Sequence, residues 1–187
     1  MPGFSESFNN GLGSFDHTWG GADTSKSGQV TLRGNSGIMM DNPTHKSMGT
    51  GYGYYEVKAS MSADKAGPAV VLWPGDDVWP GTEIDMVEVI HGRAYGAMHW
   101  DAGGDRYDTV NFNGVDETKV HTYGVEWEAG RVTYSVDGRV MGSIDHNVGR
   151  DHAHGGTDVV MSLMNGSNDT HLTVYEVSYT PSDDAWG

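Results

Sequence analysis

The chain has 187 residues, which suits one domain with a complete hydrophobic core, so residues 1–187 are treated as a single domain. Its 26 acidic and 11 basic residues give a formal net charge of −15, and this excludes nucleic acid as an expected partner because phosphate binding needs a concentrated basic surface. The charge fits a neutral partner instead, and the absence of cysteine excludes disulfides and metal–thiolate sites.

No run of residues is long and apolar enough to span a membrane, so we expect no membrane partner. Met1 is followed by PGFSES rather than by the charged segment and apolar core of a signal peptide. The sequence is therefore interpreted as a mature form or an excised domain, which leaves export open.

Short runs of β-branched and aromatic residues recur along the chain, between turns rich in Gly, Asp and Asn. The predicted strands are 29–32, 52–61, 69–73, 83–90, 94–100, 108–112, 121–127, 131–136, 139–144, 158–164 and 171–180. Asp137-Gly138 suits a two-residue type I′ turn, so 121–144 is predicted to form a three-stranded meander. This spacing of strands and turns predicts an all-β fold, an antiparallel β-sandwich.

The longest polar loop is predicted at 145–156, and it contains His146, His152 and His154. The His-x-His spacing is compatible with zinc, whereas a polar, mobile loop explains the same residues without a metal. We predict no transition-metal site there.

Three acidic residues lie within six positions in the run GTEIDMVEVIHG. Side chains on a strand alternate between faces, so Glu83 and Asp85 share one face and Glu88 is out of phase. A β-bulge at Met86–Val87 inserts one residue and restores the phase, which places all three carboxylates on one face.

Such a cluster fits three interpretations: a solvated strand face that discourages edge pairing, a carboxylate site for a hard cation, or the catalytic site of a glycosidase.

With the bulge, the Cα atoms of Glu83 and Glu88 lie ~13 Å apart at about 3.3 Å per residue. If both glutamate side chains lean inward, their carboxyl groups come within the ~5–5.5 Å separation of a retaining glycosidase. Asp85 is shorter and is suited to orient a nucleophile, and the crowding of carboxylates raises one pKa, as a general acid requires.

The run EIDMVE resembles the E-x-D-x-x-E signature of glycoside hydrolase family 16, the group of laminarinases, agarases and lichenases. Four further stretches of the chain also resemble the family and follow the same order: GYGYYEVK (51–58), LWPGDDVWPGTEID (72–85), HTYGVEWEAGRVTYSVDG (121–138) and VMSLMNGS (160–167). The resemblance covers nearly the whole chain and points to the bulged subgroup. It implies a β-jelly roll with a substrate cleft on its concave face.

The resemblance also implies a retaining, endo-acting hydrolase with Glu83 as nucleophile, Asp85 as its helper and Glu88 as general acid/base. A neutral polysaccharide, either a β-1,3-glucan or a mixed β-1,3/1,4-glucan, is the expected substrate. The alternatives are a bacterial exopolysaccharide or an algal galactan as substrate, or a non-catalytic carbohydrate-binding module on the same fold. We expect a secreted or extracellular monomer that needs no cofactor for catalysis.

Four further residues are predicted to bind substrate. Trp73 and Trp79 precede the acidic strand and match cleft positions of the family, where apolar sugar faces stack on aromatic rings; core packing is the alternative for both. His99 matches a histidine that the bulged subgroup places beside the acids. Alternation puts Asp101 on the same face as His99 and Trp100 on the core side.

The chain departs from the family at several places, two of which concern metal binding and substrate binding. Several members bind a structural calcium through a terminal-strand Asp, but here Tyr175 stands at that position beside Glu176, so calcium remains an alternative with Glu6 as a candidate ligand. The run 162–164 (Ser-Leu-Met) replaces an aromatic sugar platform of the lichenases.

Overall fold

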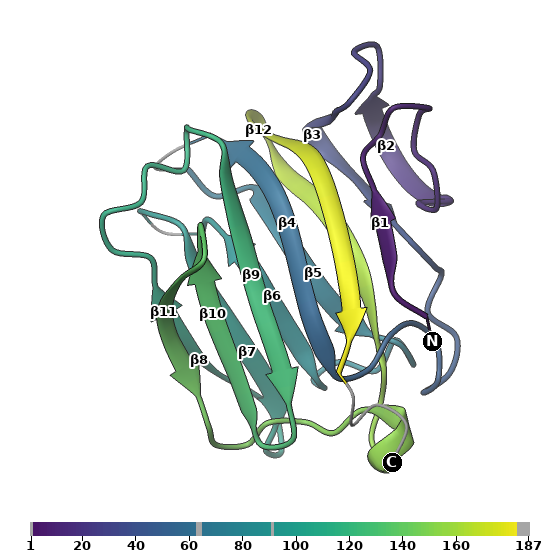
Figure 1. Cartoon of the computed structure of the whole chain (residues 1–187), viewed down its shortest axis with the longest axis vertical. Coiled ribbons are helices and arrows are strands. Elements are labelled where there is room, and N and C mark those ends of the chain that lie inside the picture. Colours follow the sequence, from purple (N-terminus) through teal and green to yellow (C-terminus); the bar gives the residue numbers. More distant parts are fainter. Residues whose placement is uncertain (1, 63–64, 91, 183–187) are drawn as a thin grey trace.

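The computed structural model describes residues 2–62, 65–90 and 92–182 (Figure 1). These residues form twelve strands and one short 3₁₀ helix. The strands are β1 (Phe4–Glu6), β2 (His17–Asp23), β3 (Val30–Met39), β4 (Gly53–Met61), β5 (Pro68–Pro74), β6 (Glu83–Glu88), β7 (Tyr95–Asp101), β8 (Asp105–Asn111), β9 (His121–Glu128), β10 (Arg131–Val136), β11 (Arg139–Ile144) and β12 (Val159–Pro181), and the helix is η1 (His152–His154). The described part of the chain has no helix that could cross a membrane.

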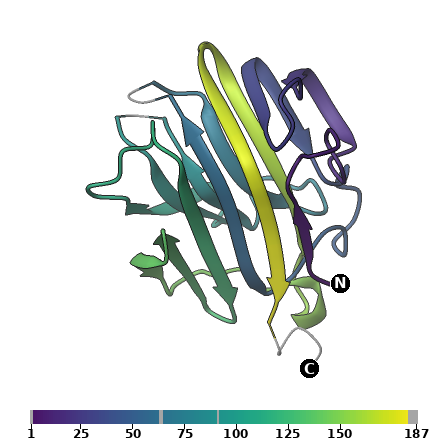
Figure 2. The ribbon, with the colours of Figure 1, turned by 45° about the horizontal axis from the view of Figure 1, so that its top comes forward.

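The strands pair antiparallel in the order β11-β10-β9-β4-β12-β5-β6-β7-β8, with β1 and β3 also on β12 and β2 on β3. Figures 1 and 2 show this ribbon folded into two curved layers, with β4 and β9 to β11 in one layer and β5 to β8 in the other. The long strand β12 belongs to both layers, because 159–165 pairs with β5 and 172–181 pairs with β4. The predicted all-β sandwich is confirmed.

The hydrophobic core lies between the two layers. Strand β4 alternates buried and more exposed side chains along its length, as the period of two requires. Fully buried side chains from both layers include Tyr55, Val57, Val70, Leu72, Ile84, Met86, Val125, Trp127, Tyr134 and Val177. Burial of one such aliphatic side chain stabilises the fold by about 1.5–3 kcal/mol. Trp127 is among the largest fully buried side chains of this core.

Two predictions about the strands were wrong. Strands β1 and β2 were not anticipated, and the segments 158–164 and 171–180 form one strand rather than two. The turn-like residues between those segments form an irregular corner, where the register on β3 shifts between Ser167 and His171. The side-chain amide of Asn165 donates to the carbonyls of Gly34 and Ser167 at 2.7 and 2.8 Å, which holds the corner in the sheet.

The predicted hairpin at Asp137-Gly138 is confirmed. Val136 pairs with Arg139 across a two-residue loop, and Asp137 and Gly138 have φ values of 51° and 75°. Positive φ at both loop residues is what a type I′ turn requires.

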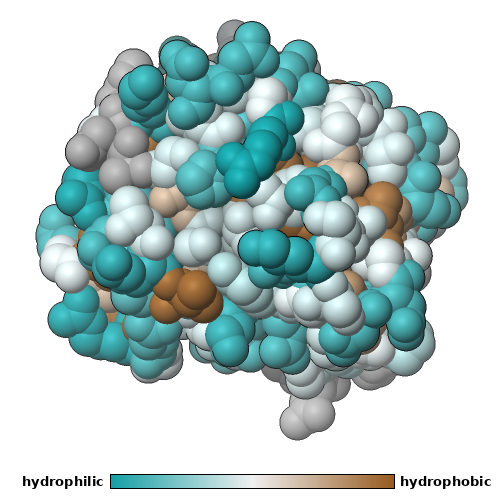
Figure 3. Space-filling view, turned by 90° about the horizontal axis from the view of Figure 1, so that it is seen from above, coloured by the Kyte–Doolittle hydropathy of each residue, from teal (hydrophilic) through white to brown (hydrophobic). Residues whose placement is uncertain are grey.

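The face of the molecule seen in Figure 3 carries mainly hydrophilic residues, and hydrophobic residues form small separate patches on it.

Candidate active site

Strand β6 carries the predicted bulge. Between Asp85 and Glu88, the two residues Met86 and Val87 lie opposite Gly96 alone on β7. The register on the other neighbour, β5, shifts at the same place. Met86 and Val87 are both fully buried, whereas Glu88 is only half-buried. Glu88 therefore turns out of the core, onto the face of β6 that also carries Asp85; we call this the acid face.

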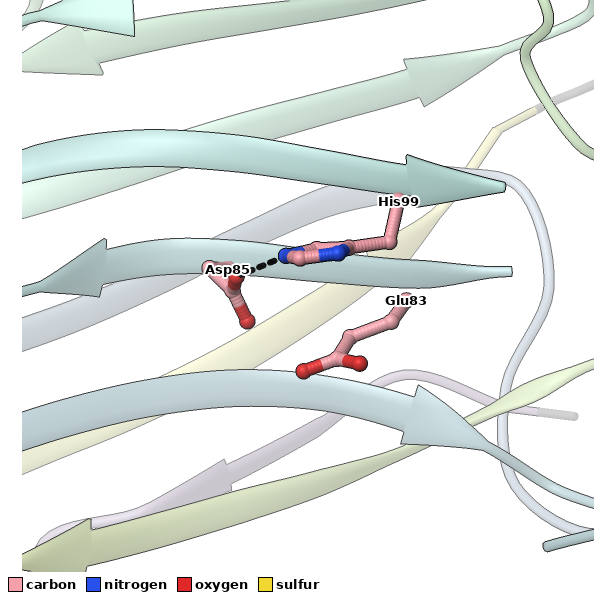
Figure 4. Close-up of side chains that lie close together, drawn as sticks. All are labelled: Glu83, Asp85 and His99. Carbon is pink, nitrogen blue, oxygen red and sulfur yellow. Dashed lines mark ion pairs between the residues drawn. The ribbon is translucent and has the colours of Figure 1, made fainter. Parts of the chain in front are cut away.

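The central carboxylate is held by a histidine from the neighbouring strand. Figure 4 shows the ring of His99 reaching from β7 to Asp85, with Glu83 beside the pair. Nε2 of His99 lies 3.2 Å from Oδ2 of Asp85, and Nδ1 lies 2.9 Å from Oδ1 of Asp105. The Asp85 side chain is 3% exposed and that of His99 is 16% exposed, so the pair is largely shielded from water.

Asp85 also interacts with the carboxyl groups of Glu83 and Glu88. Its second oxygen, Oδ1, has no N–H or O–H partner among the described residues. A hydrogen bond between two carboxyl groups requires a proton on one of them. The cluster therefore accommodates a shared proton next to Asp85, and the deep burial of this residue contradicts the solvated-face interpretation.

The pKa values of the cluster shift strongly. Burial, followed by the charge of Asp85, raises the pKa of Glu83 to about 8, and burial raises the pKa of Asp85 to about 6 although the hydrogen bond with His99 opposes this. Burial also raises the pKa of Glu88. Burial lowers the pKa of His99, but the hydrogen bonds with Asp85 and Asp105 outweigh it and raise the pKa to about 9. At neutral pH the cluster therefore holds a protonated imidazole and at least one protonated carboxyl group.

Both predicted tryptophans lie near the acids. The indole N–H of Trp79 donates to Oε2 of Glu83 at 2.6 Å, and Trp79 remains 48% exposed, which places it outside the core. Trp73 is half-buried and its N–H donates to Oδ1 of Asp77 at 2.8 Å. Since Val71 pairs with Asp85, alternation along β5 puts Trp73 on the acid face as well.

Asp101 occupies a different setting from His99. Its Oδ1 accepts the backbone N–H groups of Gly103 and Gly104 at 2.9 and 3.0 Å, so its observed contacts are those of a turn residue. Its role in substrate binding stays a prediction. Asp105, the residue that does contact His99, was missed, although it pairs with Asp101 in the hairpin register and therefore shares its face.

A cavity of about 540 Å³ adjoins the cluster at the ends of β7 and β8, and Tyr95 and Asn111 form part of its lining. Tyr95 pairs with Glu88 across β6 and β7 and hydrogen-bonds to its carboxyl group. The acid face thus continues through Tyr95 to this cavity.

The same cluster is the candidate for a cation site. Among the described residues, Glu83, Asp85 and His99 form the one group of three whose ligand atoms all lie within 4.8 Å of one another. Both nitrogens of His99 face carboxylates, and its raised pKa favours the protonated ring, which has no lone pair for a metal. The chemistry of this site therefore favours proton handling over metal binding.

The other metal candidates do not converge on a site. His154 contacts Asp151 at 2.6 Å, whereas His146 lies 3.4 Å from Asp108, so the histidines of the 145–156 loop have separate partners. At the calcium candidate, the carboxylate of Glu6 accepts the backbone N–H of Phe8 at 2.8 Å. A structural calcium therefore stays an untested alternative.

The chain is similar to known proteins over most of its length. The model of the Glycosyl hydrolases family 16 matches residues 12–180. The chain is 32% identical over 108 residues to the endo-1,3-1,4-beta-glycanase EglC of Rhizobium meliloti (strain 1021), a match that covers 54% of this chain and 23% of that relative. The chain thus spans about a quarter of the length of this relative.

Two solved structures show the same fold. A prokaryotic β-1,3-1,4-glucanase (lichenase) from a mouse hindgut metagenome superposes with a TM-score of 0.72 at 15% identity, over 97% of this chain and 100% of that chain. The laminarinase catalytic domain of Thermotoga maritima MSB8 gives 0.68 at 15% identity, over 96% and 97% of the two chains. At these identities the likeness concerns the jelly-roll architecture.

Proposed function

The chain belongs to glycosyl hydrolase family 16, and on that premise we propose that it cleaves a β-1,3-glucan or a mixed β-1,3/1,4-glucan at internal bonds with retention of configuration. The observation that carries this proposal is the bulge in β6, which brings Glu83, Asp85 and Glu88 onto one face. A binding module needs no such cluster, because buried carboxylates with raised pKa values destabilise the fold and bring chemistry rather than affinity.

The proposed reaction has two displacements. In the first, an ionised Glu83 oxygen attacks the anomeric carbon, the glycosidic C–O bond breaks, and the proton of Glu88 passes to the leaving oxygen. In the second, Glu88 takes a proton from water, the water oxygen attacks the anomeric carbon, and the bond to Glu83 breaks. Both glutamates have raised pKa values in the free protein, so position rather than pKa assigns their roles.

The neighbours of Glu83 prepare it for attack. The indole N–H of Trp79 donates to Oε2, and the protonated ring of His99 lowers the pKa of Glu83 against the effects of burial and of Asp85. Glu83 is ionised when the shared proton lies on Asp85, and its carboxylate is then beside two positively polarised groups, the indole N–H of Trp79 and the ring of His99. Asp105 fixes the orientation of His99 by its hydrogen bond to Nδ1.

The substrate proposal rests on charge and on similarity. A net charge of −15 favours a neutral glycan over a polyanion, and the printed name of EglC describes a 1,3-1,4-β-glycanase. An extracellular site of action follows as part of the same proposal, because polymeric glycans are met outside the cell. A β-linked bacterial exopolysaccharide is the second candidate substrate.

The decisive experiment replaces the nucleophile. Glu83→Gln is expected to reduce the release of reducing ends from lichenan and laminarin by at least about 10³-fold, with an unchanged circular dichroism spectrum. Early NMR spectra of the wild-type products should show the β-anomer first. Glu126→Gln, an exposed glutamate on β9, is the matched control and should keep full activity.

Undiminished hydrolysis by Glu83→Gln would remove Glu83 as the nucleophile. A wild-type protein that cleaves only an exopolysaccharide would move the substrate to the second candidate. A wild-type protein that cleaves no β-glycan but is retarded by them in affinity gels would favour a binding module.

A further inference from the structure

The acid face continues across the sheet to an aromatic residue at its far edge. Trp19 of β2 pairs with Gly37 of β3, and Gly37 pairs with Met164 of β12. Met164 pairs with Ala69 of β5, which pairs with Glu88. Paired residues of neighbouring strands share a face, so Trp19 and Glu88 lie in one row that crosses the strands.

The indole of Trp19 rests directly on the backbone of the sheet. A Cβ atom added at Gly37 would lie 2.0 Å from Cζ2 and 2.5 Å from Cε2 of Trp19, so only glycine leaves room for the ring. Trp19 is half-buried, with the ring of His17 at 6.1 Å. A tryptophan that is fixed on one side and partly exposed on the other is suited to stack on the apolar face of a sugar.

The row also sets the distance over which this residue would act. Strand β2 lies four strand spacings from β6, in the order β2-β3-β12-β5-β6, which is about 19 Å at about 4.8 Å per spacing. A chain that reaches from the acids to Trp19 therefore spans several sugar units. At its other end the row passes through Tyr95 to Asn111 and the cavity that both residues line.

A purely structural role is the alternative for Trp19. An aromatic ring on an edge strand covers backbone and discourages pairing with other chains. However, β2 has no fully buried residue, so Trp19 has little core to complete. A structural role and a sugar-binding role predict different effects of removing Trp19. The loss of structural support would affect substrates of every length equally, whereas the loss of a distal sugar contact would affect only long substrates.

We propose that Trp19, seated on Gly37, is a distal sugar-stacking platform that gives the protein a preference for long β-glucan chains. This inference rests on the proposed hydrolase function and adds a specificity-determining residue far from the reacting atoms. Between the indole and Glu88 the row continues through Met164 and Ala69, whose apolar side chains give a glucan chain a surface to lie across.

The test measures kcat and KM on mixed-linkage β-glucan oligosaccharides and laminarioligosaccharides of increasing length. Trp19→Ala is expected to lower kcat/KM about tenfold on long chains through KM, with kcat retained, and to leave trimers and tetramers unaffected. Gly37→Ala keeps the tryptophan but displaces its ring, and should reproduce the length-dependent loss. Tyr175→Ala, a half-buried aromatic residue in the half of β12 that pairs with β4, is the matched control and should change nothing.

If Trp19→Ala lowered kcat/KM equally for oligosaccharides of all lengths, or for none of them, the proposed role of Trp19 would be wrong. If the wild-type protein cleaves none of these oligosaccharides, the proposed hydrolase function fails separately. The platform is then judged by titration calorimetry of the same long chains. About tenfold weaker binding by Trp19→Ala supports it, and unchanged binding, or no binding by the wild-type protein, overturns it.

Discussion

Asp85 and Asp151 are both almost completely buried, yet their surroundings are opposite in character. Asp151 precedes the 3₁₀ helix and accepts the backbone N–H of Tyr52 at 3.0 Å, that of His154 at 3.1 Å, and Nδ1 of His154 at 2.6 Å. Asp85 contacts one imidazole and two carboxyl groups, and one of its oxygens has no N–H or O–H partner in the described structure.

The difference shows what a buried carboxylate contributes. Hydrogen-bond donors compensate the lost hydration of Asp151, so this residue ties the 151–154 turn to the start of β4 and stabilises the fold. The neighbours of Asp85 leave much of its lost hydration uncompensated, which costs stability and makes proton transfer easier. We therefore expect the same substitution to have opposite effects at the two positions.

Asp85→Asn gives the largest expected effect of the pair. Loss of the carboxylate between the two glutamates should lower kcat on a β-glucan by about 10²–10⁴-fold, because the shared proton and the position of Glu83 both depend on it. The melting temperature should not fall, since the cost of burying this charge exceeds the gain from its hydrogen bond with His99, and the amide oxygen of Asn still accepts that bond. Steady-state kinetics and a thermal melt check both parts, and a melt several degrees lower would break the comparison.

Asp151→Asn should act on stability instead. The amide keeps one acceptor oxygen but turns an N–H₂ group toward backbone donors, so the free energy of unfolding should drop by about 2–3 kcal/mol. Urea unfolding at neutral pH measures this loss, and kcat of the folded fraction should stay within a few-fold of wild type. If Asp151→Asn lost activity as severely as Asp85→Asn while remaining stable, the contrast between the two residues would be wrong.

The pH dependence of stability tests the titrating cluster itself. The fold raises the pKa of Glu83 from 4.5 to about 8, of Asp85 from 3.8 to about 6 and of His99 from 6.5 to about 9. Each group favours the folded state while protonated, and this stabilisation is lost as the pH rises through the folded-state pKa. The free energy of unfolding should therefore fall between about pH 4 and pH 9.

Glu83→Gln removes one of these titrating groups, so its stability should fall less steeply over the same pH range. Urea titrations at several pH values measure the slope. Val140→Ala, at a position that is 64% exposed, is the control and should keep the wild-type slope. An identical slope in Glu83→Gln and wild type would show that the cluster is not the source.

The sequence predicted the acidic strand in detail because its information is local. Alternation leaves Glu88 out of phase with Glu83, and only an inserted residue reconciles three acids with one face, so the bulge at Met86–Val87 could be predicted and is confirmed. Asp105 could not be found this way. Its contact with His99 depends on the register of a hairpin whose turn contains Gly103 and Gly104, and alternation along a single strand points to Asp101 instead.

The errors at the edges of the fold have a similar cause. Strand β1 has three residues, and β2 contains two glycines and mostly exposed side chains, so neither shows a hydrophobic alternation. The corner of β12 contains turn-type residues, and it is kept within one strand by backbone pairing with β3 and by the long-range hydrogen bond from the Asn165 amide to the Gly34 carbonyl. Such bonds join segments far apart in the sequence and leave no local pattern.

The position of β12 in the chain has a consequence for biosynthesis. This strand is made last among the described strands, yet it lies between β4 and β5 and also pairs with β1 and β3. Until it has left the ribosome, the earlier strands have open edges and neither layer has its central member. We therefore expect the nascent chain to remain unfolded and dependent on chaperones until residue 181 has emerged, and then to close in one late cooperative step.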